Sequence, residues 1–418
     1  MANKRTTRKI QKSVTRATKT LAKSHSGRVT LVFIALLLVV AIAFGAWWFY
    51  FRKPEQTTPV ISPDAVIDNN THDNNNANDD PQNNDDEDEY SCAYIQAYPA
   101  VSDQDISIHF LEVGNHYTGD CVYIKTETCD ILIDCGSRLN SLPTITDYLS
   151  HYVTDGVFEY VILTHAHQDH IAGFAAAQYN NSFFGAYSVE VFIDSATLVT
   201  TAVYNRYVTN LEKAVTEHGT THYTALQCIN ETDGAQTTYA VGGGYTMTIL
   251  DTEYYETPSS NENNNSVCCL FSNGTRNYLL TGDLEQEGEE SLIERNTLPH
   301  VDLFKAGHHG SYTASSAALM AVIQPKTVVV CCCAGDDEYT SDNAKQFPSQ
   351  QFVNNVAPYT SEIYVTTLND ESVEGKHVSF NGNVVYMSKG SVYKVACSAS
   401  ATKLQDSEWF HENRVLPT

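Results

Sequence analysis

The sequence predicts an α/β fold over residues 92–418. Segments typical of strands and helices interleave along this region, and polar side chains gather where the strands end. The first elements are apolar or alternating runs at 106–113, 121–126 and 130–134, which are typical of strands, and a helical spacing of apolar residues over 143–151. Since ligands of such sheets bind beyond the carboxyl ends of the strands, functional residues are expected there.

The later elements continue the same alternation. We expect strands at 160–163, 189–193, 245–250, 266–271, 278–281, 301–305, 327–333, 362–366 and 384–387, and helices at 196–217, 287–294, 314–322 and 348–355. A two-halved sandwich of similar βα units would fit this order.

The beginning of the chain predicts a single membrane anchor. Residues 1–29 contain nine Lys or Arg and no acidic residue, and residues 30–51 run without a charge for the length of a hydrocarbon core. The aromatic residues at the distal end of this run are typical of a membrane interface. By the positive-inside rule, the basic tail lies in the cytoplasm and the bulk of this single-pass cell-membrane protein is extracellular. A buried core helix and a cleaved signal peptide are the alternatives.

Charge divides the remainder of the chain. Residues 52–91 are crowded with Asn and Asp and bury too little apolar surface to fold, so we expect a solvated linker. Residues 92–418 contain 14 basic and 39 acidic residues. Such a domain repels polyanions unless metal ions or a local basic patch intervene, which disfavours nucleic acid as a partner.

The cysteines do not decide whether the domain contains disulfide bonds. Eleven cysteines in an exported chain would ordinarily suggest disulfides. Those at 268–269 and 331–333 instead lie in apolar runs, where adjacent strand residues point to opposite faces and Cys behaves as a small hydrophobe. A bridge between Cys92 and Cys397, near the two ends of the domain, stays open because connectivity does not follow from sequence.

The strongest chemical signal is His165-Ala-His167-Gln-Asp169-His170, which follows the apolar strand at 160–163. On a tight turn, alternate residues can converge on one cation while the next pair faces a second. Imidazole and carboxylate donors suit Zn²⁺ or a similar divalent ion. The segment therefore predicts a metal site at the end of this strand.

An HxHxDH segment after a strand is the signature of the metallo-β-lactamase superfamily, which residues 105–390 resemble. Three further segments carry the resemblance, namely Ile131-Leu-Ile-Asp134-Cys-Gly136, Leu279-Leu-Thr-Gly-Asp283 and Lys305-Ala-Gly-His308-His309-Gly-Ser311. The chain is most similar to the metallo-β-lactamase domain of ComEC-type competence proteins and to its stand-alone relatives, through Phe110-Leu-Glu-Val-Gly114, Asn263-Asn-Asn-Ser266 and the paired His308-His309.

The resemblance implies an αββα sandwich and a metal-dependent hydrolase that binds one or two Zn²⁺ ions, or Mn²⁺. Such a cation makes hydroxide available near neutral pH and stabilises the charge that develops on the scissile group. The implied metal ligands are histidines and aspartates from three segments: His165, His167, Asp169, His170, Asp283, His308 and His309.

These ligands fall into two expected groups. The first two histidines of the HxHxDH segment would hold one cation, and its Asp-His pair would hold a second, together with either His308 or His309. Asp283 would bridge both cations, and Asp134 would orient the histidines from behind. The catalytic roles fall to Asp169, Asp283 and His309.

The chain also departs from the superfamily pattern. The usual Asp-Val-Gly-Gln-Gly-Asp segment is three residues longer here, which leaves the position of its final residue, Asp120, open. The middle histidine of many members has no clear counterpart, and His218 and His222 are candidates by position only. Lys305 and Ser311 could contact an anionic substrate, although a strand-end Lys is more often solvated.

The function expected from these features is that of a membrane-anchored, extracytoplasmic phosphodiesterase that acts on nucleic acid or on a cell-envelope polymer. Hydrolysis of a carboxylic ester, lactone or β-lactam is the alternative on the same fold, because a fold does not fix a substrate. A metal-stabilised binding module with weak catalysis is the non-enzymatic alternative.

Overall fold

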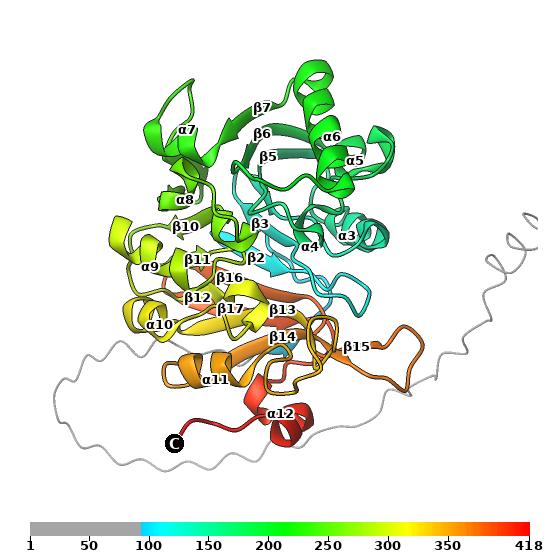
Figure 1. The fold of residues 1–418 in the computed structure, drawn as a ribbon, viewed down its shortest axis with the longest axis vertical. Helices are drawn as coiled ribbons and strands as arrows, with labels where there is room; N and C mark the ends of the chain where they lie inside the picture. Colours follow the sequence, from blue (N-terminus) through cyan, green and yellow to red (C-terminus); the bar gives the residue numbers. More distant parts are fainter. Residues whose placement is uncertain (1–92) are drawn as a thin grey trace, which may run out of the picture. The chain divides into compact units, whose positions relative to one another are not determined.

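Two mixed β-sheets form the centre of the protein, which a computed structural model describes over residues 93–418 (Figure 1). The first sheet runs in the order β1 (Tyr94–Ile95), β17 (Val392–Cys397), β16 (Val384–Lys389), β2 (Ile106–Phe110), β3 (Val122–Thr126), β4 (Asp130–Ile133), β5 (Val157–Ile162), β6 (Ser188–Asp194) and β7 (Thr221–Thr224). The second runs in the order β15 (His377–Ser379), β14 (Glu362–Asn369), β13 (Thr327–Ala334), β12 (Leu303–Lys305), β11 (Asn277–Leu280), β10 (Cys268–Ser272), β9 (Tyr245–Leu250) and β8 (Thr238–Gly242).

Short helices connect these strands. They are α3 (Leu142–Leu149), α4 (Gln168–Ile171), α5 (Phe183–Ala186), α6 (Ala202–His218), α7 (Ala225–Asn230), α8 (Glu253–Glu256), α9 (Gln286–Arg295), α10 (Ala317–Ile323), α11 (Gln350–Val356) and α12 (Glu408–Asn413). Figure 1 shows α3, α5 and α6 gathered at the upper right and α9, α10 and α11 at the lower left. The two groups of helices thus cover different sheets.

Three apolar clusters define four layers. Side chains of both sheets, such as Ile108 of β2 and Phe271 of β10, pack together in the central cluster. A second cluster joins the outer face of the first sheet to α3, α5 and α6, with Leu211 as an example from α6. A third joins the outer face of the second sheet to α9, α10 and α11, with Leu319 from α10. This is the αββα sandwich that the sequence predicted.

The cysteines behave as small apolar residues. Cys269 and Cys331 pack in the central cluster, whereas their neighbours Cys268 and Cys332 pack in the outer one, so the predicted alternation across the strands is confirmed. All ten cysteines of residues 93–418 are buried free thiols. The partner considered for Cys397 lies outside the described residues.

Most predicted elements are present, with shifted ends. The helix expected at 196–217 begins at Ala202, because the Thr201 side chain accepts a hydrogen bond from the backbone N–H of Tyr204 and so caps the helix there. Strands β1, β7, β8, β15 and β17 and helices α4, α5, α7, α8 and α12 were not expected. Strand β17, for example, follows β16 as an antiparallel partner after a turn at Gly390, whose φ is +57°.

The predicted basic tail, transmembrane segment and linker lie outside the described residues. Within residues 93–418, no helix has the length and apolar character that crossing a bilayer requires.

Gly136, just after β4, allows two loops to come together. A Cβ atom at this position would lie 1.6 Å from the carbonyl oxygen of Asp169 and 2.6 Å from the backbone N of His170. The backbone N–H of Cys135 donates to the His170 carbonyl over 2.8 Å, and that of Asp120 donates to the Asp169 carbonyl over 3.1 Å. The HxHxDH loop is therefore held against the segment after β4 by backbone contacts that leave no room for a side chain.

The substitution Gly136→Ala is expected to lower the free energy of unfolding by more than about 2 kcal/mol and to reduce the metal content, because the added methyl group separates these loops. Denaturant unfolding and elemental analysis of the full-length protein measure both. Gly156→Ala is the matched control: Gly156 has φ of +75° but open space at the Cβ position, so it should cost only about 1 kcal/mol of backbone strain. Equal effects at the two positions would contradict this account.

Candidate metal centre

The predicted ligand segments meet at one edge of the sheets. Strands β4 and β5 are parallel neighbours in the first sheet, and β11 and β12 are parallel neighbours in the second. The loops after these four strands carry, in order, Asp134, the segment 165–170, Asp283 and the one-turn 3-10 helix η4 (Gly307–Gly310). Since carboxyl ends of parallel strands lie at a common edge, residues distant in sequence converge there.

Four buried side chains form a cluster at this edge. One ligand atom each from Asp120, His170, Asp283 and His309 lies within 4.8 Å of all the others. Asp283 is central, because its Oδ2 lies 3.1 Å from His170 Nε2 and 3.2 Å from His309 Nε2. Asp120, whose position the sequence left open, is thus a member of the cluster.

Asp169 lies at the edge of the cluster. The paired histidines His308 and His309 differ in their distance from Asp283, the centre of the cluster. The Oδ2 of Asp169 is 3.6 Å from His309 Nε2 and accepts a 2.9 Å hydrogen bond from the hydroxyl of Tyr339. His308 lies further out, with Nε2 4.0 Å from Asp283 Oδ2. The geometry therefore favours His309 over His308 as the residue that joins the cluster. Tyr339 gave no signal in the sequence.

His165 and His167 lie next to the cluster. The Nε2 of His165 is 3.0 Å from Nδ1 of His167, and the ring of His165 lies 4.2 Å from that of His170 between centroids. Burial and the neighbouring imidazole of His170 hold the pKa of His165 well below its usual range. His165 is therefore neutral, which is the form that binds a metal ion.

The two candidates for a middle histidine lie elsewhere. His218, at the end of α6, stacks on Tyr179 with ring centroids 4.8 Å apart. The Nε2 of His222, in β7, is 2.8 Å from Asp194 Oδ1. Neither of them joins the cluster.

Asp134 holds the ligand loop from behind. It accepts hydrogen bonds from the backbone N–H of Thr164 over 2.8 Å and from its hydroxyl over 2.7 Å, and its Oδ2 lies 2.7 Å from His170 Nδ1. These contacts leave His170 Nε2 facing Asp283. The geometry supports the orienting role that the resemblance implied for Asp134.

Lys305 is buried, so the expectation that it is solvated is wrong, whereas its contact with an anionic substrate stays a prediction. It is 2% exposed. Its Nζ pairs with Asp120, lies 3.6 Å from Asp283 Oδ1 and donates to the Gly282 carbonyl. Burial disfavours the ammonium form, but Asp120 and Asp283 raise the pKa of Lys305 above its usual range. Ser311 is also largely buried, but it lines a pocket that His308 lines too, so its contact with a substrate stays a prediction.

The cluster attracts positive charge. Burial alone would lower the pKa values of His170 and His309, but Asp283 acts on both and, with Asp134 and Asp120, raises them well above the usual range. Asp283 Oδ1 and His309 Nε2 are buried and make no hydrogen bond within residues 93–418. A divalent cation would supply both the charge and the missing partner, and mixed carboxylate and imidazole donors suit Zn²⁺ or Mn²⁺. These residues fit such an ion.

Behind the ligands, the segment Asn263-Asn-Asn-Ser266 and its neighbour Glu262 join the HxHxDH loop to the loop that carries Asp283. The segment forms the 3-10 helix η3 (Glu262–Asn265), which is buried. The carboxylate of Glu262 accepts a 2.9 Å hydrogen bond from the backbone N–H of Ala166, between the first two histidines. The hydroxyl of Ser266 accepts one of 3.2 Å from the backbone N–H of Asp283. This segment thus positions ligands and does not supply them.

Comparison with known proteins places the chain in a family. The family model "Anti-Pycsar protein Apyc1" matches residues 109–355, a stretch that includes every member of the cluster. The chain belongs to this family. Together with the αββα layers and the converging ligand segments, this membership shows the metallo-β-lactamase fold that the sequence predicted.

Curated relatives match over short stretches. Over 88 residues, the chain is 32% identical to ComE operon protein 3 of Bacillus subtilis (strain 168). This match covers 19% of this chain and 11% of that protein. Over 63 residues, the chain is 36% identical to Recombination protein 2 of Haemophilus influenzae (strain ATCC 51907 / DSM 11121 / KW20 / Rd). This match covers 15% of this chain and 8% of that protein. The predicted resemblance to ComEC-type proteins is therefore confirmed as partial homology.

A solved structure with a similar arrangement is the metallo-β-lactamase fold protein YhfI from Bacillus subtilis. The sequences are 13% identical, the TM-score is 0.39, and the match covers 68% of this chain and 100% of that one.

Substitution of the paired histidines tests which of them binds the ion. His309→Ala is expected to weaken Zn²⁺ or Mn²⁺ binding by more than about 100-fold, because a direct ligand contributes more than its supporting partners do. His308→Ala is the matched control and should leave metal affinity near that of the unsubstituted protein. Metal titration of the full-length chain, followed by elemental analysis, measures both. The reverse order of effects would exclude His309 as the ligand.

A buried glutamate supports the η4 turn. Glu289 of α9 accepts hydrogen bonds from the backbone N–H groups of Ser315 and Ser316 over 2.6 and 2.8 Å. The hydroxyl of Ser315 in turn accepts one from the backbone N–H of Gly307, which begins η4. Burial raises the pKa of Glu289 to about 7, although the hydrogen bonds from Ser315 and Ser316 oppose the rise. A titratable carboxyl group therefore lies behind η4.

Stability should depend on pH through Glu289. Its pKa is raised on folding from 4.5 to about 7, so its contribution is fully present below about pH 4.5 and is lost as the pH rises through 7. Relative to Glu289→Gln, which cannot titrate, the full-length protein should lose about 3 kcal/mol of unfolding free energy between pH 4.5 and 8. Denaturant unfolding of both proteins with excess chelator measures the difference. A difference that stays constant with pH would show that Glu289 does not titrate in this range.

Proposed function

We propose that this protein is a metal-dependent phosphodiesterase whose substrate is a small phosphodiester of the cyclic nucleotide class. The observation that carries the proposal is the place of Asp283, which lies within 3.2 Å of both His170 and His309 in a buried site. Such a set of donors suits the divalent cations that hydrolyse phosphodiesters. Membership in the Anti-Pycsar Apyc1 family supports a cyclic nucleotide as the substrate class.

The residues of the chain would hold the ion and order the site. When bound, the cation supplies hydroxide near neutral pH and offsets charge on the phosphoryl oxygens. Asp169 is held in place by the Tyr339 hydroxyl, and the Nδ1 of His308 lies 3.1 Å from Glu285 Oε1. Hydrogen bonds, the first from His308, lower the pKa of Glu285 to about 2 against the effect of burial. The ionised carboxylate thus orients His308 so that Nε2 is the ring nitrogen nearer to Asp283.

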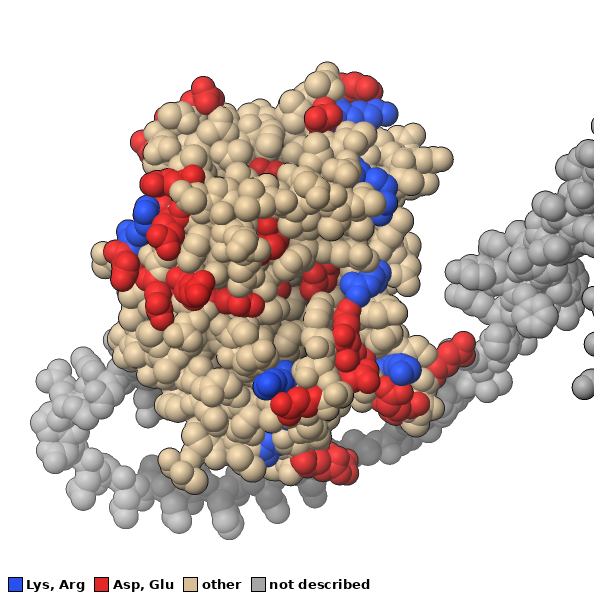
Figure 2. Space-filling model, viewed as in Figure 1, with Lys and Arg blue, Asp and Glu red and all other residues tan. Residues whose placement is uncertain are grey.

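Charge and pocket size favour a small substrate over a polymer. On the face shown in Figure 2, acidic side chains gather at the left over α9, and Lys and Arg side chains are scattered. A polyanion would need a continuous basic track to bind such a surface. Next to the cluster lies a pocket of about 290 Å³, lined among others by His308, Tyr339 and Phe347. A nucleotide-sized ligand suits this volume better than a polymer chain does.

The predicted membrane anchor bears on the side of the membrane where the hydrolase domain lies. If residues 30–51 span the cell membrane with the basic tail inside, the hydrolase domain lies on the outer side. The enzyme would then act on phosphodiesters outside the cytoplasm, which is why nucleic acid and envelope polymers belong in the assay beside cyclic nucleotides.

Full-length protein supplied with Zn²⁺ or Mn²⁺ is expected to hydrolyse bis-p-nitrophenyl phosphate and a cyclic mononucleotide. Asp283→Asn should reduce kcat by more than about 100-fold, because it removes the central carboxylate of the cluster. Asp147→Asn, on the exposed face of α3, is the matched control and should retain activity. Spectrophotometric and chromatographic assays follow the two substrates.

Each other outcome points to a different function. Hydrolysis of single-stranded DNA or an envelope polymer, without any turnover of cyclic nucleotides, would replace the proposed substrate class. Turnover of nitrocefin or a lactone without phosphodiester hydrolysis would overturn the phosphodiesterase assignment. Stoichiometric metal without any turnover would instead support a binding module.

A further inference from the structure

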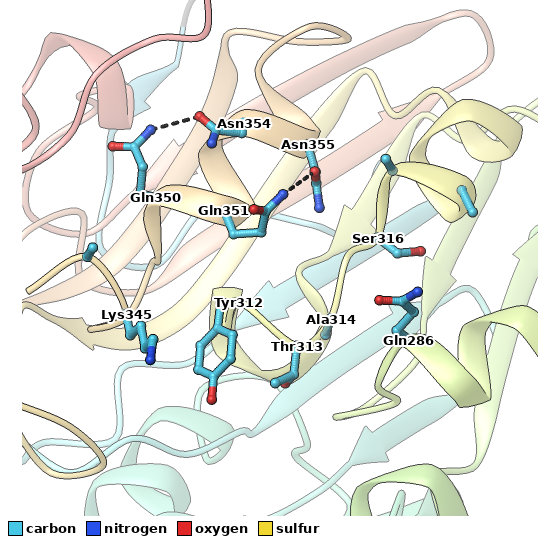
Figure 3. A pocket seen from close by; sticks show the side chains of 13 residues that line it. Gln286, Tyr312, Thr313, Ala314, Ser316, Lys345, Gln350, Gln351, Asn354 and Asn355 are labelled. Carbon is cyan, nitrogen blue, oxygen red and sulfur yellow. Dashed lines mark hydrogen bonds between the residues drawn. The ribbon is translucent and has the colours of Figure 1, made fainter. Parts of the chain in front are cut away.

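A larger pocket of about 600 Å³ is lined by residues of α11 and of the segment 312–318 that follows η4 (Figure 3). It shares Tyr312, Thr313 and Lys345 with the smaller pocket that reaches His308. The two pockets are therefore neighbours with a common wall. We infer that the larger pocket binds the heterocyclic base of a nucleotide whose phosphate lies at the metal centre, an inference that rests on the proposed function.

The lining of the larger pocket is mostly uncharged, with Lys345 as its one charged side chain. No Asp or Glu is among its lining residues, although acidic residues outnumber basic ones by 39 to 14 over residues 92–418. Primary amides dominate instead, from Gln286, Gln350, Gln351, Asn354 and Asn355. Amides offer donors and acceptors without charge, which is what the edge of a nucleobase requires.

Two hydrogen-bonded pairs along α11 fix these amides. Gln350 Nε2 donates to Asn354 Oδ1 and Gln351 Nε2 donates to Asn355 Oδ1, each over 2.9 Å (Figure 3). Within the described part of the chain, no hydrogen bond is made by Gln351 Oε1 or Asn354 Nδ2. Because Gln351 and Asn354 are three residues apart on one helix, they share a face. An acceptor and a donor thus stand side by side for a ligand.

Tyr312 provides a stacking surface between the two pockets. Its side chain is 49% exposed, unlike the buried aromatic residues of the core. Lys345 Nζ lies 5.3 Å from the centroid of the Tyr312 ring and 3.6 Å from Asp342 Oδ2, so its charge is already partly paired. An exposed ring next to amides is a common arrangement for binding an unstacked base. The smaller pocket, between Tyr312 and His308, is left for the sugar.

Base recognition is tested first by activity. The ratio of kcat/KM for a cyclic mononucleotide to kcat/KM for bis-p-nitrophenyl phosphate, which has no base, should fall about tenfold in Tyr312→Ala and in the double variant Gln351→Ala, Asn354→Ala. Tyr312→Phe keeps the ring and should restore the ratio. Asn205→Ala, on the exposed surface of α6, is the matched control. A ratio unchanged by all these substitutions would overturn the inference while the proposed function stands.

Binding tests the pocket independently of catalysis. In excess chelator, calorimetric titration of the full-length chain compares the four common 5′-nucleoside monophosphates with ribose 5-phosphate. We expect at least one nucleotide to bind about tenfold more tightly than the sugar phosphate, and Tyr312→Ala to abolish that advantage. If no phosphodiester is hydrolysed yet this advantage is present, the proposed function fails and the base pocket stands. If nucleotides and ribose 5-phosphate bind equally, the pocket does not recognise a base.

Discussion

The arrangement of the protein depends on the burial of four carboxylates at one edge of the sandwich. Asp120, Asp134, Asp169 and Asp283 are all at most 8% exposed, and a buried carboxylate is strongly unfavourable unless it is paired. Within the described residues, Lys305 is the permanent cation that lies among them. The imidazoles of the cluster and the predicted metal ion supply the remaining positive charge. The fold is therefore coupled to the ionisation of this site and to its metal occupancy.

The same requirement explains the strained backbone around the cluster. Asp134, His308 and His309 have φ values of +61°, +44° and +54°, a region that costs about 1–2 kcal/mol for residues other than glycine. Each of these conformations directs a side chain toward the cluster. A regular strand or helix would direct the same side chain elsewhere. Hydrogen bonds from Thr164 hold Asp134, and Glu289 supports η4 through Ser315. Ligand placement is thus a property of the layer behind the ligands as well as of the ligands themselves.

Local patterns predicted the α/β class and most of the strands, since alternation marks strands, and the short HxHxDH segment pointed to a loop that the structure brings to the cluster. What the sequence could not predict depends on contacts between distant residues. Asp120 and Lys305 lie 185 positions apart, and only their pairing in the folded protein shows that the lysine is buried. Tyr339 lies in a loop with no motif, and it gains its role by reaching Asp169. Strand β8, with its Thr-Tyr-Ala-Val-Gly sequence, is defined by its pairing with β9.

The excess of acidic residues bears on which of the proposed substrates could approach the candidate metal centre. Repulsion between a polyanion and an acidic surface adds up over every phosphate within about 8–10 Å of the protein, the screening length at physiological salt. A cyclic mononucleotide carries one phosphate, so it meets only a small part of that repulsion. Its base is uncharged and is not repelled, and the neutral amides around Tyr312 are the part of the surface that can add affinity without a basic patch. The acidic exterior and the mostly uncharged lining of the larger pocket therefore both favour the proposed small ligand over a polymer.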